Sequence, residues 1–258
     1  MAMASLAMAM PNGAKAMAMQ NGAKAMAMAS SATTVPSGTE QHHGLEETIL
    51  SRKSIRKFVS TPVPCHLLME ALELARHAPS NSNIQPWRLY IAEGDRRDRL
   101  REELLAECKR EPPQPYLNLP EEYRKFRSEL GAQVYGSMGI KHDDKEARVK
   151  AVTRNWEFFG APVMAIVCLH RDLRLADAIS VGMFVQTLLL ALTARGISSC
   201  CQASIAMYPD VIRKELNIPL ELNIICGISI GYADMDFAAN HVRAPRAPLE
   251  DNVTILDS

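Results

Sequence analysis

The 258-residue chain has no excess of charge of either sign, and its aromatic residues are scarce. It contains 29 basic and 29 acidic residues, and only 5% of its residues are aromatic. A general nucleic-acid surface needs a basic excess, and single-strand binding needs clustered aromatic rings. We therefore expect no nucleic-acid partner, and any anion site in this chain must be local.

The six cysteines lack the spacing of metal ligands, and two of them lie in apolar runs. This distribution predicts reduced thiols in a cytoplasmic protein and no bound metal. The adjacent Cys200 and Cys201 suggest redox chemistry, but two neighbouring thiols close only a strained ring.

Long apolar runs are also absent, with one exception. The segment 176–195 approaches the roughly 18 residues of a spanning helix, but it carries Asp177 and Arg195. Its apolar residues lie nearly all round a helix, which predicts a central, buried helix and no membrane partner.

Residues 1–40 differ from the rest of the chain. "NGAKAMAM" occurs at 12–19 and again at 21–28, in a tract of mostly Ala and Met whose first 39 residues contain no acid. Organelle transit peptides share this lack of acids, but they are rich in arginine, which is missing here. We interpret the tract as a disordered low-complexity extension, with organelle targeting as the alternative, followed by one domain over 41–258.

Within that domain, helical and strand patterns alternate, which predicts helices covering a sheet. Strands are expected over 87–94, 161–170 and 222–234, with a short strand or loop over 197–205. Helices are expected over 45–52, 64–78, 95–110, 176–195 and 208–218, with a Pro-rich loop and one or two charged helices in 111–160.

The most basic stretch is "SRKSIRKFVS", at 51–60. Charge runs are usually a solvated turn at a helix end, where cations suit the negative dipole. In an extended segment, however, Arg52, Ser54 and Arg56 would alternate onto one side, pinned by two apolar neighbours. Two guanidiniums and a hydroxyl on one side form a phosphate clamp. Lys57 would fall on the other side and meet water.

Two further stretches are candidates for binding. "APSNSNIQPW", at 78–87, is a helix-to-strand loop by composition, but its amides also suit the edge of a planar heterocycle. "GYADMDFAANHVRAPRAPLEDNV", at 231–253, ends a strand and becomes a Pro-rich tail. Such a tail must pack on something, and a partner subunit would provide that support. Arg246 in the tail would then join Arg52 at the same phosphate.

Together these stretches resemble the FMN-dependent nitroreductase family, from about residue 45 to the C-terminus. "RKSIRKF" is similar to the family's Arg-x-Ser-x-Arg-x-Phe motif, and "APSNSNIQPWRLYI" to its Pro-Ser-x-x-Asn-x-Gln-Pro-Trp loop and strand. "GMFVQTLLLALTARGISSCCQAS" resembles the core helix and the flavin-contacting strand, and the tail resembles the family's C-terminal motif. The segment "GSMGIKHDDKEARVKAVTRNWEFFGAPV" most resembles the subgroup that reduces nitrobenzoate and nitrobenzene.

The resemblance implies an α+β nitroreductase-like flavin fold, with a central, mostly antiparallel sheet flanked by helices. It also implies an intertwined homodimer with two FMN sites across the subunit interface. The phosphate, the ribityl chain and the pyrimidine edge would be held by Arg52, Lys53, Ser54, Arg56 and Arg246. The ring would be approached from the other subunit by Pro79, Ser80, Asn81 and Asn83. The backbone near the reactive flavin nitrogen would be that of Cys201, Gln202 and Ala203.

The activity implied by the resemblance is ping-pong hydride transfer from NAD(P)H, through FMN, to a nitroaromatic, quinone or similar small acceptor. The flavin carries this chemistry, so no catalytic side chain is implied. Two alternatives stay open. One is a family member that uses FMN for ene-reduction, dehalogenation or oxygen-dependent dehydrogenation of a natural product. The other is a non-enzymatic nucleotide-binding module that uses the basic clamp alone.

Overall fold

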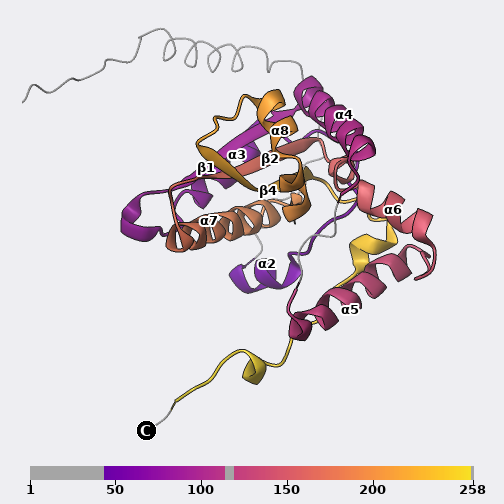
Figure 1. Ribbon diagram of the computed structural model, residues 1–258. Coiled ribbons are helices and arrows are strands. Elements are labelled where there is room, and N and C mark those ends of the chain that lie inside the picture. The colour runs from indigo at the N-terminus through magenta and orange to yellow at the C-terminus, as the bar shows by residue number, and fades with distance from the viewer. Residues whose placement is uncertain (1–43, 114–118, 257–258) are drawn as a thin grey trace, which may run out of the picture. The chain divides into compact units, whose positions relative to one another are not determined.

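Four strands form the centre of the structure, a computed structural model that describes residues 44–113 and 119–256 (Figure 1). They are β1 (Trp87–Glu93), β2 (Val163–His170), β3 (Ser198–Gln202) and β4 (Leu222–Gly231). Their order in the sheet is β1-β2-β4-β3, and every neighbouring pair is antiparallel. The predicted antiparallel sheet is confirmed, and β1 and β3 are its two edges. The predicted extension 1–40 lies outside the described residues.

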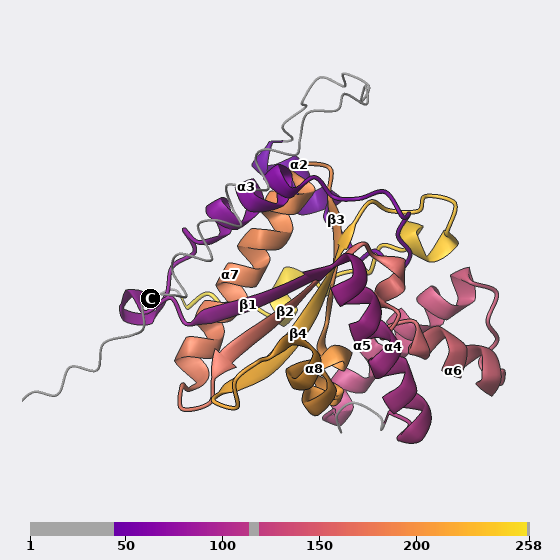
Figure 2. The ribbon, with the colours of Figure 1, turned by 90° about the horizontal axis from the view of Figure 1, so that it is seen from above.

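The described part of the chain also contains seven α-helices. They are α2 (Leu45–Ser51), α3 (Cys65–Ala75), α4 (Gly94–Arg110), α5 (Glu121–Ser137), α6 (Lys145–Thr153), α7 (Leu175–Thr193) and α8 (Pro209–Leu216). In Figure 2, α3 and α7 lie on one side of the sheet, and α4 and α8 lie on the other. The expected helices and strands are present, with their ends shifted by a few residues, and the loop-rich stretch 111–160 contains two helices.

The sequence of β2 explains why both faces of the sheet are covered. Residues of a strand point alternately to opposite faces. In β2, Val163, Ala165 and Val167 enter a core cluster with α3 and α7. Met164 and Ile166 enter a second cluster with α4 and α8. A continuous apolar run therefore buries the strand on both sides and fixes it at the centre of the fold.

Helix α7 is long and apolar enough to cross a membrane by length and composition, but half of it is buried against the sheet. Its core face includes Phe184 and Leu188, both almost fully buried. The prediction of a helix buried all round is wrong on one side, because Leu175 is 78% exposed and Ile179 is 57% exposed. Among the described residues of one chain, nothing covers this apolar side of α7.

Candidate functional site

The basic stretch lies alongside β3, at the edge of the sheet. Ser54 forms a parallel bridge with Ser199, and the Ile55 N–H donates to the Ser199 carbonyl oxygen at 3.1 Å. Ile55 and Phe58 are buried and anchor the segment, as predicted. An edge strand has backbone groups free for such pairing. Two segments almost 150 residues apart in the sequence therefore meet here.

The charges of this stretch act on the cysteines of β3. Burial raises the pKa of the Cys200 thiol to about 11, and the nearby guanidiniums of Arg56 and Arg52 oppose this shift. The Cys201 thiol lies 3.6 Å from that of Cys226. This hydrogen bond is the main cause that lowers the pKa of Cys201, with a smaller contribution from Arg52. Arg52 and Arg56 therefore lie within electrostatic reach of the strand residues expected near the flavin.

Several cations in this region have no ion-pair partner among the described residues. Within residues 44–113 and 119–256, no carboxylate forms an ion pair with Arg52, Lys53, Arg56 or Arg243. Burial, reinforced by the charge of Arg243, lowers the pKa of Lys53. Such a site favours an anion, because an anion would offset the repulsion among these cations.

Arg243 is a site residue that the sequence reasoning did not assign. Its guanidinium donates to the Leu50 carbonyl oxygen at 2.7 Å and lies close enough to Lys53 to affect its pKa. The sequence could have indicated Arg243, because it lies in the same tail motif as Arg246. The predicted contact, Arg246, donates only to the carbonyl oxygens of Ala244 and Pro245 within the described residues. Its phosphate role stays a prediction.

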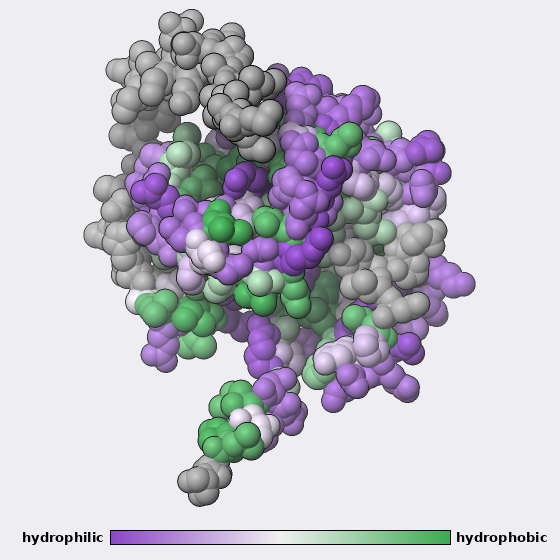
Figure 3. Space-filling view, turned by 60° about the vertical axis from the view of Figure 1, so that its left-hand side comes forward, coloured by the Kyte–Doolittle hydropathy of each residue, from purple (hydrophilic) through white to green (hydrophobic). Residues whose placement is uncertain are grey.

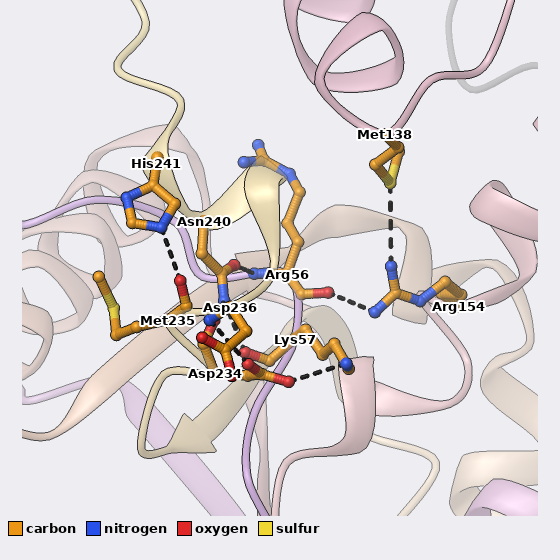
Figure 4. A network of polar contacts seen from close by, with 9 residues as sticks. All are labelled: Arg56, Lys57, Met138, Arg154, Asp234, Met235, Asp236, Asn240 and His241. Carbon is orange, nitrogen blue, oxygen red and sulfur yellow. Dashed lines mark hydrogen bonds and ion pairs between the residues drawn. The ribbon is translucent and has the colours of Figure 1, made fainter.

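Buried polar contacts hold the backbone of the basic stretch in place (Figure 4). The fully buried Asn240 accepts the Arg56 N–H at 2.7 Å and donates to the carbonyl oxygens of Lys57 and Asp234, both at 2.8 Å. Arg154 donates to the Arg56 carbonyl oxygen at 2.7 Å. The Arg56 side chain extends away from this network in Figure 4. Its guanidinium donates to the Ser54 carbonyl oxygen at 3.2 Å and has further N–H groups that can meet a ligand.

Lys57 corrects one expectation. It does not simply meet water, because its ammonium lies 2.8 Å from the Asp234 carboxylate. This ion pair is the main cause that lowers the pKa of Asp234. Asp234 lies in the turn after β4, and the Phe58–Ala233 bridge brings that turn beside the basic stretch. Lys57 therefore anchors the segment, and the other cations of the stretch are the candidates for binding an anion.

Gln202, at the end of β3, is buried. Its buried side chain accepts from the Ser229 hydroxyl at 2.5 Å and donates to the Asn155 carbonyl oxygen at 3.0 Å. Cys201 and Ala203, on either side, are exposed. The following turn packs closely on β4, since a Cβ at Gly227 would lie 2.8 Å from Cγ1 of Ile205. The structure thus leaves Cys201 and Ala203 exposed on either side of the buried Gln202, and the role of this stretch at the flavin stays a prediction.

The predicted ring-binding loop, 79–83, is fixed to the start of α7. The Asn81 N–H donates to the Ser180 hydroxyl at 3.1 Å, and its side-chain amide donates to the Asp177 carboxylate at 3.3 Å. Ser82 and Asn83 have positive φ angles of 48° and 57°. Residues other than glycine adopt this conformation only at an energetic cost, and such outliers cluster at functional sites.

One chain does not bring this loop to the basic stretch. The loop leads directly into the edge strand β1. The basic stretch lies alongside the opposite edge strand, β3. Three strand spacings, roughly 14 Å in all, separate the two edges. Figures 1 and 2 both show the loop beside the start of α7, away from the basic stretch. Within the described residues of one chain, the two segments therefore do not meet.

Residues 49–232 match the model of the family described as the nitroreductase family. The chain belongs to this family. Among curated proteins, it is 36% identical over 228 residues to nitroreductase NfnB of Mycolicibacterium smegmatis, across 86% of this chain and 97% of that protein. It is 34% identical to 4-nitrobenzoate reductase of Pseudomonas putida, across 78% of this chain and 90% of that enzyme.

The fold is also that of solved members of the nitroreductase family. The crystal structure of the FMN- and NADPH-dependent nitroreductase NfnB from Sphigopyxis sp. strain HMH superposes with a TM-score of 0.81 at 29% identity. The superposition covers 84% of this chain and all of that one. The predicted α+β nitroreductase-like fold is therefore confirmed.

Proposed function

We propose that this member of the nitroreductase family is an FMN-dependent oxidoreductase. It passes electrons from NAD(P)H to a nitroaromatic, quinone or similar small acceptor. The observation that carries this proposal is the group of cations at Arg52, Lys53, Arg56 and Arg243. Within the described residues these cations form no ion pair with a carboxylate, and they lie beside β3. The names of similar proteins, FMN- and NADPH-dependent nitroreductases, support the same activity.

The residues present fit the phosphate end of FMN. A phosphate group carries close to two negative charges, and guanidinium groups bind its oxygens with charge-assisted hydrogen bonds. Arg52, Lys53, Ser54 and Arg243 would hold this group, because the cations around Lys53 already repel one another. Ser54, which bridges to Ser199 and lies beside Cys200, adds a hydroxyl donor.

When bound, FMN supplies the hydride chemistry. The protein's own task is to hold positive charge where negative charge develops on a bound ring. Arg56 suits this task, since Asn240 and Arg154 fix its backbone and its guanidinium has more N–H groups than the one that donates to Ser54. The backbone of residues 201–203 would line the ring. No catalytic side chain is required.

We further propose that the active form is an intertwined homodimer, in which Pro79, Ser80, Asn81 and Asn83 serve the site of the partner. The uncovered face of α7 and the C-terminal segment support this. Ile255 is 82% exposed and Leu256 is 91% exposed, and Figure 3 shows hydrophobic residues along this segment. Exposed apolar surface of this extent is typical of an interface. Cytoplasmic location stays a prediction.

Absorption spectra and rapid kinetics test the proposed function. We expect the purified protein to be yellow and its flavin to be reduced by NADPH or NADH. Reoxidation should then be followed by stopped flow with a nitroaromatic, a quinone and an α,β-unsaturated carbonyl in parallel. Fast reoxidation by the nitroaromatic or the quinone supports the proposal, and fast reoxidation by the enone alone favours the ene-reductase alternative. A colourless protein that takes up no added FMN would contradict it.

A further inference from the structure

A second basic pocket lies next to the candidate flavin site. Its cavity, of about 720 Å³, is enclosed by α5, by the loop that leads to α6, and by Arg56. Leu130, Val134 and Ile140 supply apolar surface, and the ring of Tyr135 lies among them. The pocket thus offers contacts that suit a planar hydrophobic group.

The polar lining of this pocket is almost entirely cationic. Besides Arg56, it includes Arg124, Arg127, Arg148 and His142, and no Asp or Glu of the described residues lines it. A solvated helix face normally mixes charges of both signs. Helix α5 does contain acidic residues, but they lie outside the lining. The segregation of charge distinguishes the pocket from an ordinary surface.

Two of these arginines are held by contacts that leave their charge uncompensated. The Arg124 Nε–H donates to the Leu119 carbonyl oxygen at 2.9 Å, and the Arg148 guanidinium lies 4.5 Å from the centre of the Tyr135 ring. Within the described part of the chain, neither arginine forms an ion pair with a carboxylate. Both keep N–H groups available for an anion.

We propose that this pocket binds the oxyanion of a substrate, a carboxylate or phosphate group carried by a molecule with a planar ring. The apolar lining would receive the ring, and Arg124 and Arg148 would bind the anionic group. This inference rests on the proposed function, because Arg56 belongs both to this pocket and to the candidate flavin site. A ligand here lies against a residue that flanks the bound flavin.

Two substrates of the proposed reaction can carry such a group. One is an acceptor with a carboxylate on its nitroaromatic ring. The other is the donor NADPH, whose 2′-phosphate is absent from NADH. In a ping-pong reaction the donor and the acceptor visit the site in turn, so one anion pocket can serve either.

The test compares charged and neutral ligands on the purified holoenzyme and three variants. Calorimetry gives the dissociation constants of 4-nitrobenzoate and of its neutral methyl ester, and steady-state kinetics gives KM for NADPH and NADH. Arg124→Gln is the main variant, because Arg124 is exposed and its replacement should not disturb folding. Arg148→Gln is the second. Lys125→Gln is the matched control. This substitution removes one positive charge from α5, as Arg124→Gln does, but Lys125 does not line the pocket.

We expect both arginine variants to weaken binding of an anionic ligand about tenfold, with the neutral partner changed less than twofold and Lys125→Gln without effect. A loss confined to 4-nitrobenzoate identifies the acceptor as the source of the anion, and a loss confined to NADPH identifies the donor. Equal binding of charged and neutral ligands by the wild type overturns the inference, as does an arginine effect no larger than that of Lys125→Gln. A protein that binds no flavin would contradict the proposed function. Calorimetry on that protein would still show whether the pocket binds anionic ligands.

Discussion

The two edges of the sheet carry the two halves of the candidate site in different ways. At the β3 edge, the cations form no ion pair with a carboxylate of the described residues, and burial, reinforced by the charge of Arg243, lowers the pKa of Lys53. At the β1 edge, hydrogen bonds to α7 hold a loop of amides whose backbone includes Ser82 and Asn83 at positive φ. One edge carries electrostatic repulsion and the other carries backbone strain.

Neither feature stabilises the fold of a single chain. Repulsion among cations and strained dihedral angles both cost free energy, and such features persist where surrounding contacts enforce them. An anion would offset the repulsion at the β3 edge, and a bound ring would contact the loop at the β1 edge. FMN, held between the β3 edge of one chain and the β1 edge of another, would satisfy both. The difference between the edges therefore points to a shared site.

The largest effect is expected from removing the residue that fixes the β3 edge. Asn240→Ala leaves the backbone groups of Arg56, Lys57 and Asp234 without their buried partner. We expect the free energy of unfolding to fall by about 2–4 kcal/mol, measured by urea denaturation. The control is Asp236→Ala, an exposed neighbour, with an expected change within about 0.5 kcal/mol. Equal stability of the two variants would show that the network does not hold the segment.

The next effect concerns the charge of the β3 edge. Arg52→Ala should weaken FMN binding to the apoprotein roughly ten- to a hundredfold, because one charge-assisted contact to the phosphate is lost. Quenching of flavin fluorescence measures the dissociation constant. Riboflavin, which has no phosphate, serves as the control ligand and should bind both proteins alike. Should Arg52→Ala keep the wild-type preference for FMN over riboflavin, Arg52 does not bind the phosphate.

The smallest effect on FMN binding is expected from Lys57, which anchors the basic stretch through its ion pair with Asp234. Lys57 lowers the pKa of Asp234, so this ion pair stabilises the fold above the usual carboxyl pKa of about 4 and loses its effect as pH falls through the lowered value. Lys57→Ala should raise the pKa of Asp234 towards its usual value, observable by NMR titration. FMN affinity should change less than about twofold, in contrast to Arg52→Ala. An unchanged pKa of Asp234 would contradict the assignment.

Local patterns predicted the elements and much of the β3 edge. Apolar periodicity is a local property, so the burial of Ile55 and Phe58 and the buried face of α7 could be inferred from neighbouring residues. Asn240 and Asp234 contact residues more than 170 positions away, and no local spacing signals such contacts. The exposed side of α7 was also missed, because an interface and a core have the same apolar composition.

The separation of the two half-sites had a different cause. It follows from the strand order β1-β2-β4-β3, which places the loop at 79–83 and the basic stretch at opposite edges. Strand order is a property of the whole chain, and hydrophobic patterning does not encode it directly. The family resemblance, rather than the residues themselves, indicated that the loop serves another subunit.

A mixed dimer tests the shared site most directly. One chain carries Arg52→Ala, and the other carries Asn81→Trp, whose bulky ring would block an exposed position of the β1-edge loop. Each variant alone should bind FMN weakly at both sites. The mixed dimer, purified through two different tags, is then titrated with FMN.

If each site takes its cations from one chain and its loop from the other, one site carries both changes and the second carries neither. We expect one FMN per mixed dimer to bind with wild-type affinity. If both segments serve the same chain's site, each site carries one change. A mixed dimer with no site of wild-type affinity would contradict the shared site.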